Sequence, residues 1–189
     1  MKFTLDQNCL IALERNEPTA AAIRALAEAH DKKRIQVAVL GISASERQLG
    51  GGYLDNIGAF RAYLLELGLQ GLDIYKPVGI WGVTFYDWSH CASAEDEPQM
   101  RAIHEVMFRS EYDWADVAAR TGEHVESTDG DGYRLWRNRR CDVQGLHSHI
   151  RNGADVFVTS DWHFHGKAAP LIGLGAKRIA TPDEAAALV

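Results

Sequence analysis

The sequence has few cysteines and no long apolar run. Its three cysteines, Cys9, Cys91 and Cys141, are odd in number, widely spaced and form no C-x-x-C pair. A disulfide framework is therefore not expected, and we interpret each thiol as a small buried side chain in a reducing compartment. No segment approaches the ~20 apolar residues that span a bilayer, and Asp6 comes too early for a secretory signal. We expect a cytoplasmic protein without a membrane partner.

Internal repeats and low-complexity segments are also lacking. The chain has 189 residues, of which 46% are hydrophobic and 24% are charged, as in an ordinary globular protein. A chain of this length can bury a sizeable core without disulfides or structural metals. We therefore expect a single domain over residues 1–189.

The net charge of −6 argues against a protein that coats nucleic acid without specificity. This charge is unevenly distributed. Residues 95–131 contain eleven acidic and three basic residues, a net charge of about −8, so the rest of the chain is near +2. A basic cluster follows directly, and its members are Arg134, Arg137, Arg139 and Arg140.

Short apolar runs alternate with segments of helical spacing. The predicted strands are 2–5, 35–40, 156–159 and 178–180, with a weaker candidate at 79–86. The predicted helices are 7–13, 19–30, 43–49, 53–67, 98–109, 114–120, 135–151, the first part of 162–174, and one from Pro182 onward. This alternation predicts an α/β fold with a mostly parallel central sheet flanked by helices on both faces. We interpret residues 69–134 as an elaboration that includes an acidic, α-rich insertion.

Two acidic residues come directly after predicted strands. Asp6 follows the strand 2–5, and Asp161 follows the strand 156–159. Ligands of parallel sheets collect at the carboxyl ends of the strands, which favours a binding role for both. Each can equally serve as the N-cap of the next helix.

Two further acidic residues lie on the apolar side of predicted helices. Glu46 is four residues after Ile42, and Asp142 is four residues before Leu146 and seven after Leu135. A lone acid on a helix is usually solvated, but an unpaired buried charge costs several kcal/mol and requires a partner. A divalent cation shared with the strand-end acids would supply one. An oxygen-rich ligand set favours Mg²⁺ or Mn²⁺ over Zn²⁺.

Four segments resemble PIN-domain nucleases. LDQNCLIAL resembles their first strand and turn, and VAVLGISASE resembles the second strand and the segment that carries an acidic residue. The stretch from Asp142 through GADVFVTSDWHF resembles the third and fourth acidic positions, and TPDEAAAL resembles the end of many members. The similarity covers residues 1–68 and 135–189. The family's small ribonuclease toxins, which act in toxin–antitoxin pairs, lack anything like the acidic stretch 95–131.

The resemblance implies a metal-dependent endoribonuclease that hydrolyses single-stranded RNA with one or two Mg²⁺ or Mn²⁺ ions and leaves a 5′-phosphate and a 3′-hydroxyl. An antitoxin or a second copy of the chain is a further expected partner. The resemblance also implies catalytic and metal-ligating roles for Asp6, Glu46, Asp142 and Asp161. It also implies supporting roles beside these ligands for Asn8, Thr159 and Ser160. A simple turn residue is the alternative for Asn8.

Carboxylates repel a phosphate backbone, so nearby cations must hold the substrate. We expect Arg137, Arg139 and Arg140 to contact phosphates, and pairing with the acidic insertion is the alternative. For the histidines at 147, 149, 163 and 165 we expect structural roles. For Trp81, Trp88, Trp114 and Tyr112 we expect buried packing rather than base stacking.

Three other functions compete with this prediction. The fold could serve as a non-catalytic module that binds RNA or protein, or as a nuclease directed at DNA. A phosphatase with Asp6 as nucleophile is a third possibility, but such enzymes usually need a second Asp where Asn8 stands. The sequence does not separate RNA from DNA as the substrate.

Overall fold

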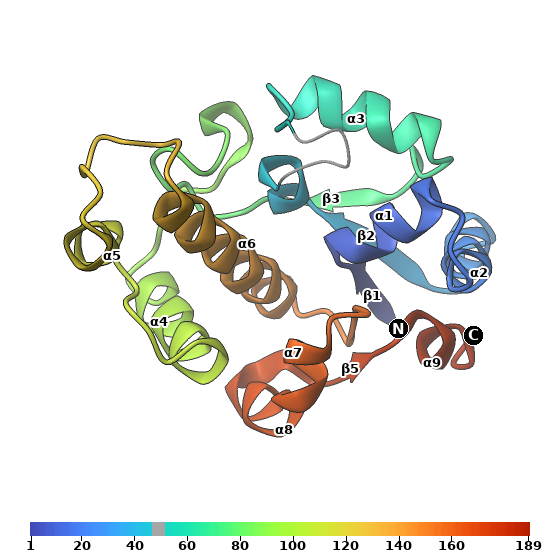
Figure 1. Ribbon diagram of the computed structural model, residues 1–189. Coiled ribbons are helices and arrows are strands. Elements are labelled where there is room, and N and C mark those ends of the chain that lie inside the picture. Colours follow the sequence, from blue (N-terminus) through green and yellow to red (C-terminus); the bar gives the residue numbers. More distant parts are fainter. Residues whose placement is uncertain (47–51) are drawn as a thin grey trace.

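The computed structural model describes residues 1–46 and 52–189, in which strands and helices alternate (Figure 1). The strands are β1 Lys2–Leu5, β2 Gln36–Leu40, β3 Asp73–Tyr75, β4 Val156–Val158 and β5 Ile179–Ala180. The α-helices are α1 Gln7–Glu14, α2 Ala20–Asp31, α3 Ile57–Glu66, α4 Asp96–Met107, α5 Trp114–Thr121, α6 Asp131–Arg151, α7 Trp162–Gly166, α8 Ala168–Leu171 and α9 Pro182–Ala186. The shorter turns are the 3₁₀ helices η1 Gly41–Ser45 and η2 Tyr86–Trp88, and the π turn η3 Ile172–Ala176.

The five strands form one parallel sheet in the order β3-β2-β1-β4-β5. The chain builds outward from β1 through β2 to β3 and then returns to the other side of β1 with β4 and β5. The direction of winding therefore reverses between β1 and β4. In open parallel sheets, the carboxyl ends of the strands at such a reversal form a crevice in which ligands bind. The predicted α/β class with a parallel sheet is confirmed.

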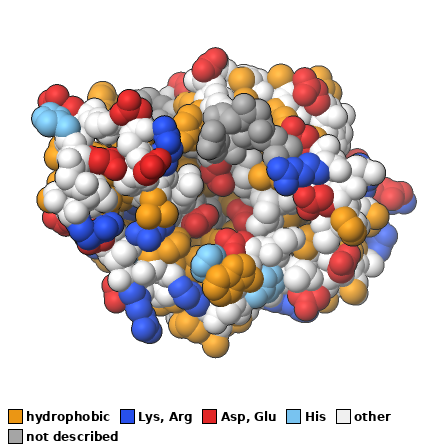
Figure 2. Space-filling view, viewed as in Figure 1, with side chains coloured by type: hydrophobic (Ala, Val, Ile, Leu, Met, Phe, Trp, Pro, Cys, Tyr) orange, Lys and Arg blue, Asp and Glu red, His pale blue; other side chains and the backbone are white. Residues whose placement is uncertain are grey.

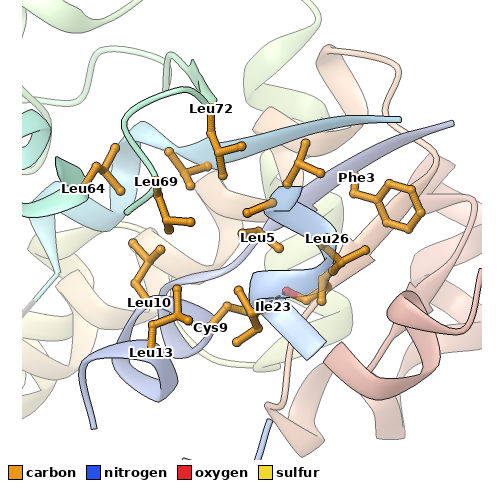
Figure 3. Close-up of a cluster of buried hydrophobic side chains, with 14 of the residues drawn as sticks. Phe3, Leu5, Cys9, Leu10, Leu13, Ile23, Leu26, Leu64, Leu69 and Leu72 are labelled. Carbon is orange, nitrogen blue, oxygen red and sulfur yellow. Dashed lines mark hydrogen bonds between the residues drawn. The ribbon is translucent and has the colours of Figure 1, made fainter. Parts of the chain in front are cut away.

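Helices cover both faces of the sheet because the strand residues alternate in direction. Phe3 and Leu5 of β1 point to the face covered by α1, α2, α3 and α9, where they pack with Ile23 and Leu26 of α2 (Figure 3). Phe157 of β4 points to the opposite face, which α4, α5, α6, α7 and α8 cover (Figure 1). Two apolar cores thus hold the sheet between two helical layers.

Helix α6 is the central element of the second layer. The acidic insertion packs against it, because α4 and α5 both contact α6. Trp114 of α5 meets Tyr133 of α6, with ring centroids 5.2 Å apart. Asp96 of α4 accepts hydrogen bonds from His147 at 3.1 Å and from Arg151 at 2.5 Å. Most acids of the insertion stay on the surface, while this one carboxylate ties the insertion to the core.

Three local predictions are wrong. Residues 79–86 form a turn rather than a strand, since the backbone N–H groups of Val83 and Thr84 both donate to the carbonyl of Ile80 at 3.1 Å. Strand β3, which pairs with β2, lies in a segment where no strand was expected. The helix expected at 43–49 is instead the 3₁₀ helix η1, and its predicted end lies outside the described residues. In the described part of the chain, no helix is long and apolar enough to cross a membrane.

Candidate functional site

The site lies where the winding of the sheet reverses. Asp6 directly follows β1, and Asp161 follows the neighbouring strand β4 after two residues. The backbone N–H of Asp6 donates to the carbonyl of Val158 at 3.0 Å, which joins the ends of the two strands. Figure 2 shows acidic side chains gathered in a hollow near the centre of this face of the molecule. The two strand-end acids thus reach the same edge of the sheet.

A network of side-chain hydrogen bonds fixes Asp6. The buried hydroxyl of Thr159 donates to Asp6 Oδ2 at 2.8 Å, and Asn8 Nδ2 donates to the same oxygen at 2.9 Å. Asn8 also accepts from the backbone N–H of Ser160 at 3.0 Å. The Thr159 hydroxyl in turn accepts from the backbone N–H of Asp161 at 3.0 Å. Asn8, Thr159 and the Ser160 backbone therefore join the two strand-end acids.

Asp161 also begins α7. Its Oδ1 accepts from the backbone N–H of His163 at 2.8 Å, which is N-cap geometry, and the His163 ring lies 3.3 Å from the same oxygen. The side chain nevertheless keeps 29% of its surface exposed. The capping role and the site role, which were posed as alternatives, are compatible here because one oxygen serves the cap and the other is left for a ligand.

Glu46 reaches the site by a route that was not expected. It is the residue after η1 and has an extended backbone, with φ −86° and ψ 158°, so it does not lie on a helical face. The chain is packed tightly before it, since all five residues of η1 are buried. A Cβ on Gly41 would meet the carbonyl oxygen of Tyr75 at 2.9 Å, so this position needs glycine. The neighbouring strand β3 therefore fixes the start of the turn that delivers Glu46.

Asp142 comes from α6, as the helical pattern predicts. The apolar stripe used to place it is only partly correct, because Leu146 is fully buried whereas Leu135 is 46% exposed. The contact between α6 and η1 is what brings Asp142 toward Glu46. Arg137 of α6 donates from Nε and Nη2 to the carbonyl of Ser45 at 3.1 and 2.9 Å. This pair of hydrogen bonds anchors α6 directly beside Glu46.

The four carboxylates influence one another electrostatically. Burial, opposed in part by hydrogen bonds and reinforced by the charge of Asp161, raises the pKa of Asp6 to about 6. Burial also raises the pKa of Glu46 well above its usual range, and the charges of the other three acids add to this effect. The pKa of Asp142 is raised by burial and then by Asp6 and Asp161. Because Asp6, Glu46 and Asp142 each respond to the charge of Asp161, the four segments converge on one region.

Asp161 contributes to this repulsion at each of the other three acids, because its charge raises the pKa of Asp6, Glu46 and Asp142. Over residues 1–46 and 52–189, no hydrogen bond or ion pair reaches the Asp142 carboxylate. Buried charges of one sign are strongly unfavourable together, and a cation bound among them would offset their repulsion.

The chemistry of the donor set fits a hard divalent ion. Carboxylate oxygens are the preferred ligands of Mg²⁺ and Mn²⁺. The nearby thiols of Cys9 and Cys141 are buried, as expected, and burial raises the pKa of both, so neither is a thiolate ligand at neutral pH. The third thiol, Cys91, was expected to be buried but is exposed. As placed, the His, Cys, Asp and Glu side chains in the described part form no group of three that would hold a metal ion without adjustment. Side-chain rotation of the carboxylates is therefore needed for shared coordination.

The three arginines expected at phosphates are placed differently. Arg137 lies over the ring of Tyr53 at 4.2 Å and donates to the carbonyls of Ser45 and Gly82, which leaves two of its five N–H groups for a ligand. Arg140 is 5% exposed, and its guanidinium lies 3.9 Å from the centre of the Tyr112 ring. Because Arg140 is buried, the expectation that it contacts phosphates is wrong.

Arg139 is directed toward the insertion. It donates to the hydroxyl of Ser110 at 2.9 Å and lies over the ring of Phe108. Its charge also contributes to lowering the pKa of Glu111. The alternative of pairing with the acidic insertion therefore describes Arg139 better than a phosphate contact. Of the expected phosphate contacts, Arg137 is the one beside an acid of the site.

The histidines on α6 are structural, as expected. His149 is fully buried between the hydroxyl of Thr4, 2.6 Å from Nδ1, and the carbonyl of Ala176, 3.0 Å from Nε2. Burial lowers the pKa of His149 to about 4, so the ring is neutral. His147 is buried against Asp96, as described above.

Two exposed aromatic side chains were not anticipated from the sequence. Trp81, which was expected to be buried, is 83% exposed, and Trp162, the residue after Asp161, is 70% exposed. Trp81 lies in a segment predicted as a strand, and Trp162 lies in a segment predicted as a helix. Hydrophobic content alone does not show whether such a ring faces solvent. The position directly after a strand-end acid was the available clue for Trp162. Comparison of the chain with protein-family models, curated proteins and solved structures finds no match.

Proposed function

We propose that this protein is a metal-dependent nuclease that hydrolyses phosphodiester bonds at the four-carboxylate site. The metal would be Mg²⁺ or Mn²⁺, and its ligands would be drawn from Asp6, Glu46, Asp142 and Asp161. The resemblance of the sequence to PIN-domain nucleases points to the same chemistry. We infer from that resemblance that the substrate is single-stranded RNA and that the biological setting is toxin-like.

One observation carries the proposal. Acids from four separate segments converge at the reversal of a parallel sheet, and the charge of Asp161 contributes to raising the pKa of the other three. Such an arrangement lowers the stability of the fold unless an ion binds. A sheet edge that needs only helix caps would not collect four carboxylates. A divalent ion accounts for all four together.

The roles of the residues follow from their positions. Thr159 and Asn8 hold one oxygen of Asp6, which leaves its other oxygen for the ion. Arg137 would contact a substrate phosphate beside Glu46 with its remaining N–H groups. A bound divalent ion would supply water activation and would stabilise negative charge on the phosphate. The protein therefore needs no nucleophilic side chain of its own.

Cleavage assays with matched variants test the proposal. Purified protein is incubated with single-stranded RNA and with single-stranded DNA of the same sequence, in Mn²⁺ or in EDTA. We expect cleavage with Mn²⁺ that leaves 5′-phosphate ends, no cleavage in EDTA, and a loss of at least 100-fold in Asp142→Asn. Asp183→Asn, at an exposed acid of α9, should match the wild type.

The other outcomes separate the alternatives. Cleavage that persists in EDTA or in Asp142→Asn would reject the metal mechanism. Cleavage of DNA alone would replace RNA as the substrate. The absence of both cleavage and Mn²⁺ binding, measured by calorimetric titration, would favour a non-catalytic module.

A further inference from the structure

The residue after Asp161 is an exposed tryptophan that is held in place. Trp162 is 70% exposed, and its ring stacks on the imidazole of His163 with centroids 4.0 Å apart and planes inclined by 28°. One face of the indole therefore rests on His163, and an exposure this high requires the other face to be open to solvent. Figure 2 shows exposed hydrophobic and histidine side chains directly beside the acidic hollow.

The support beneath this ring is firm. His163 is tied to Asp161 by its backbone N–H at 2.8 Å and by the ring contact at 3.3 Å. The next residue, Phe164, is buried and packs on Phe157 of β4 with centroids 5.0 Å apart. Single exposed hydrophobic residues are common and mean little by themselves. An indole stacked on a partner that is bonded to a carboxylate of the site is a more specific arrangement.

We propose that Trp162 is a stacking platform for an unpaired base next to the phosphodiester at the carboxylates, so that the site takes single-stranded nucleic acid. Every base has a π-face, so stacking on an aromatic ring tolerates any sequence. In a duplex those faces are covered by neighbouring base pairs, so an open indole selects for unpaired bases. The inference rests on the proposed function for the nature of the phosphodiester.

The charged group on the other side of the site fits the same ligand. Glu46 follows β2, Asp6 follows β1 and Asp161 follows β4, and these three strands are neighbours in the sheet. Arg137 lies beside Glu46, which follows β2, and Trp162 lies beside Asp161, which follows β4, so a cation and an aromatic ring lie next to the acids that come from the two neighbours of β1. A single strand laid across these acids would meet a phosphate contact beside Glu46 and a base contact beside Asp161.

Binding measurements with three variants test the platform. Fluorescence anisotropy of a labelled 12-nucleotide single strand, and of the same sequence as a duplex, is recorded in EDTA and in Ca²⁺. We expect Trp162→Ala to weaken single-strand binding by about 5- to 150-fold and Trp162→Phe to restore most of it. Val125→Ala, at a 55% exposed residue of the insertion, should have no effect. Duplex binding should be the same for all four proteins.

An abasic series separates stacking from a structural role. A single abasic sugar is moved along the 12-nucleotide strand, and we expect one position to weaken binding to the wild type but not to Trp162→Ala. An unchanged abasic penalty in Trp162→Ala, an equal loss on the duplex, or no single-strand binding in either buffer would overturn the platform. Binding that depends on Trp162, with no cleavage in Mn²⁺, would retain the platform and reject the nuclease.

Discussion

Replacing Asp6 by asparagine should stabilise the metal-free protein at neutral pH. Asparagine has the shape of aspartate, and its carbonyl oxygen can accept the hydrogen bonds that Thr159 and Asn8 donate to Asp6 Oδ2. Its amide would then face the remaining acids as a donor. The Asp6→Asn substitution therefore removes a repelled charge and keeps the hydrogen-bond network.

The magnitude follows from the pKa of Asp6, which burial and the charge of Asp161 raise from 3.8 to about 6. One pKa unit corresponds to about 1.4 kcal/mol, so the ionised carboxylate lowers the stability of the fold by at most about 3 kcal/mol. The side chain is partly exposed, and solvent screening reduces this to about 2 kcal/mol. A domain of this size gains roughly 2–4 °C per kcal/mol, so Tm should rise by about 4–8 °C.

The stability of the wild type should depend on pH because the pKa of Asp6 is raised in the fold. A raised folded pKa means that the native state holds the Asp6 proton more tightly than the unfolded state, so the wild type loses stability as pH rises from about 4 to about 6. The difference between Asp6→Asn and the wild type should be near zero below pH 4 and reach its full value above pH 6. His149 acts in the opposite direction, because its pKa is lowered to about 4. The difference between the two proteins removes that contribution.

Thermal and urea unfolding in EDTA at several pH values measure this difference. Asp155→Asn is the matched control, since hydrogen bonds from Lys177 and Lys2 lower the pKa of Asp155 and its loss should lower stability at neutral pH. Mn²⁺ should reverse the order by stabilising the wild type, by about 2.7 kcal/mol at 100 times Kd, more than Asp6→Asn. A destabilised Asp6→Asn in EDTA would refute the account of the site as a cluster of repelled charges.

Two further substitutions probe the surroundings of the site. Arg137→Ala should weaken single-strand binding and reduce the slope of its salt dependence by about one, as measured by anisotropy over a salt titration. Arg134→Ala, at an exposed arginine paired with Asp131, should change the affinity and the slope less. An unchanged slope in Arg137→Ala would contradict the phosphate contact. Thr159→Val removes a hydrogen bond that lowers the pKa of Asp6, so that pKa should rise above about 6 in a carboxyl NMR titration, and a fall would show that the hydroxyl does not stabilise the charge.

The strand-end acids could be predicted from sequence because two features agree, namely a short apolar run and an acidic residue shortly after its end. A short buried run that ends in an acid fixes both the strand and the direction of the carboxylate, as at Asp6 after β1 and Asp161 beyond β4. Asp142 was also placed correctly on α6, although Leu135, used to define the stripe, is exposed. Long helices tolerate such an error, because neighbouring positions over several turns still point to the correct side.

Glu46 and the middle of the chain show where local patterns fail. A helical spacing of apolar residues suggested a helix around Glu46, but tertiary packing against β3 imposes a 3₁₀ turn there. The strand β3 has only three residues, too few to show alternation. At residues 79–86 the β-branched and aromatic content suggested a strand, whereas Gly82 with φ +71° makes a turn. In each case, contacts distant in sequence decide the backbone.

Two unfavourable features lie on consecutive residues of this fold. Asp161 adds its charge to a group of acids and contributes to raising the pKa of the other three, and Trp162 leaves 70% of an indole in water. Asp161 caps α7, but a neutral Asn or Ser would serve as well at an N-cap, and the packing of α7 on β4 comes from Phe164 rather than Trp162. Residues that lower the stability of a fold in this way are typical of sites that bind a ligand. An acid suited to a cation, followed by a ring suited to a base, indicates that the ligand carries a phosphate and an unpaired base together.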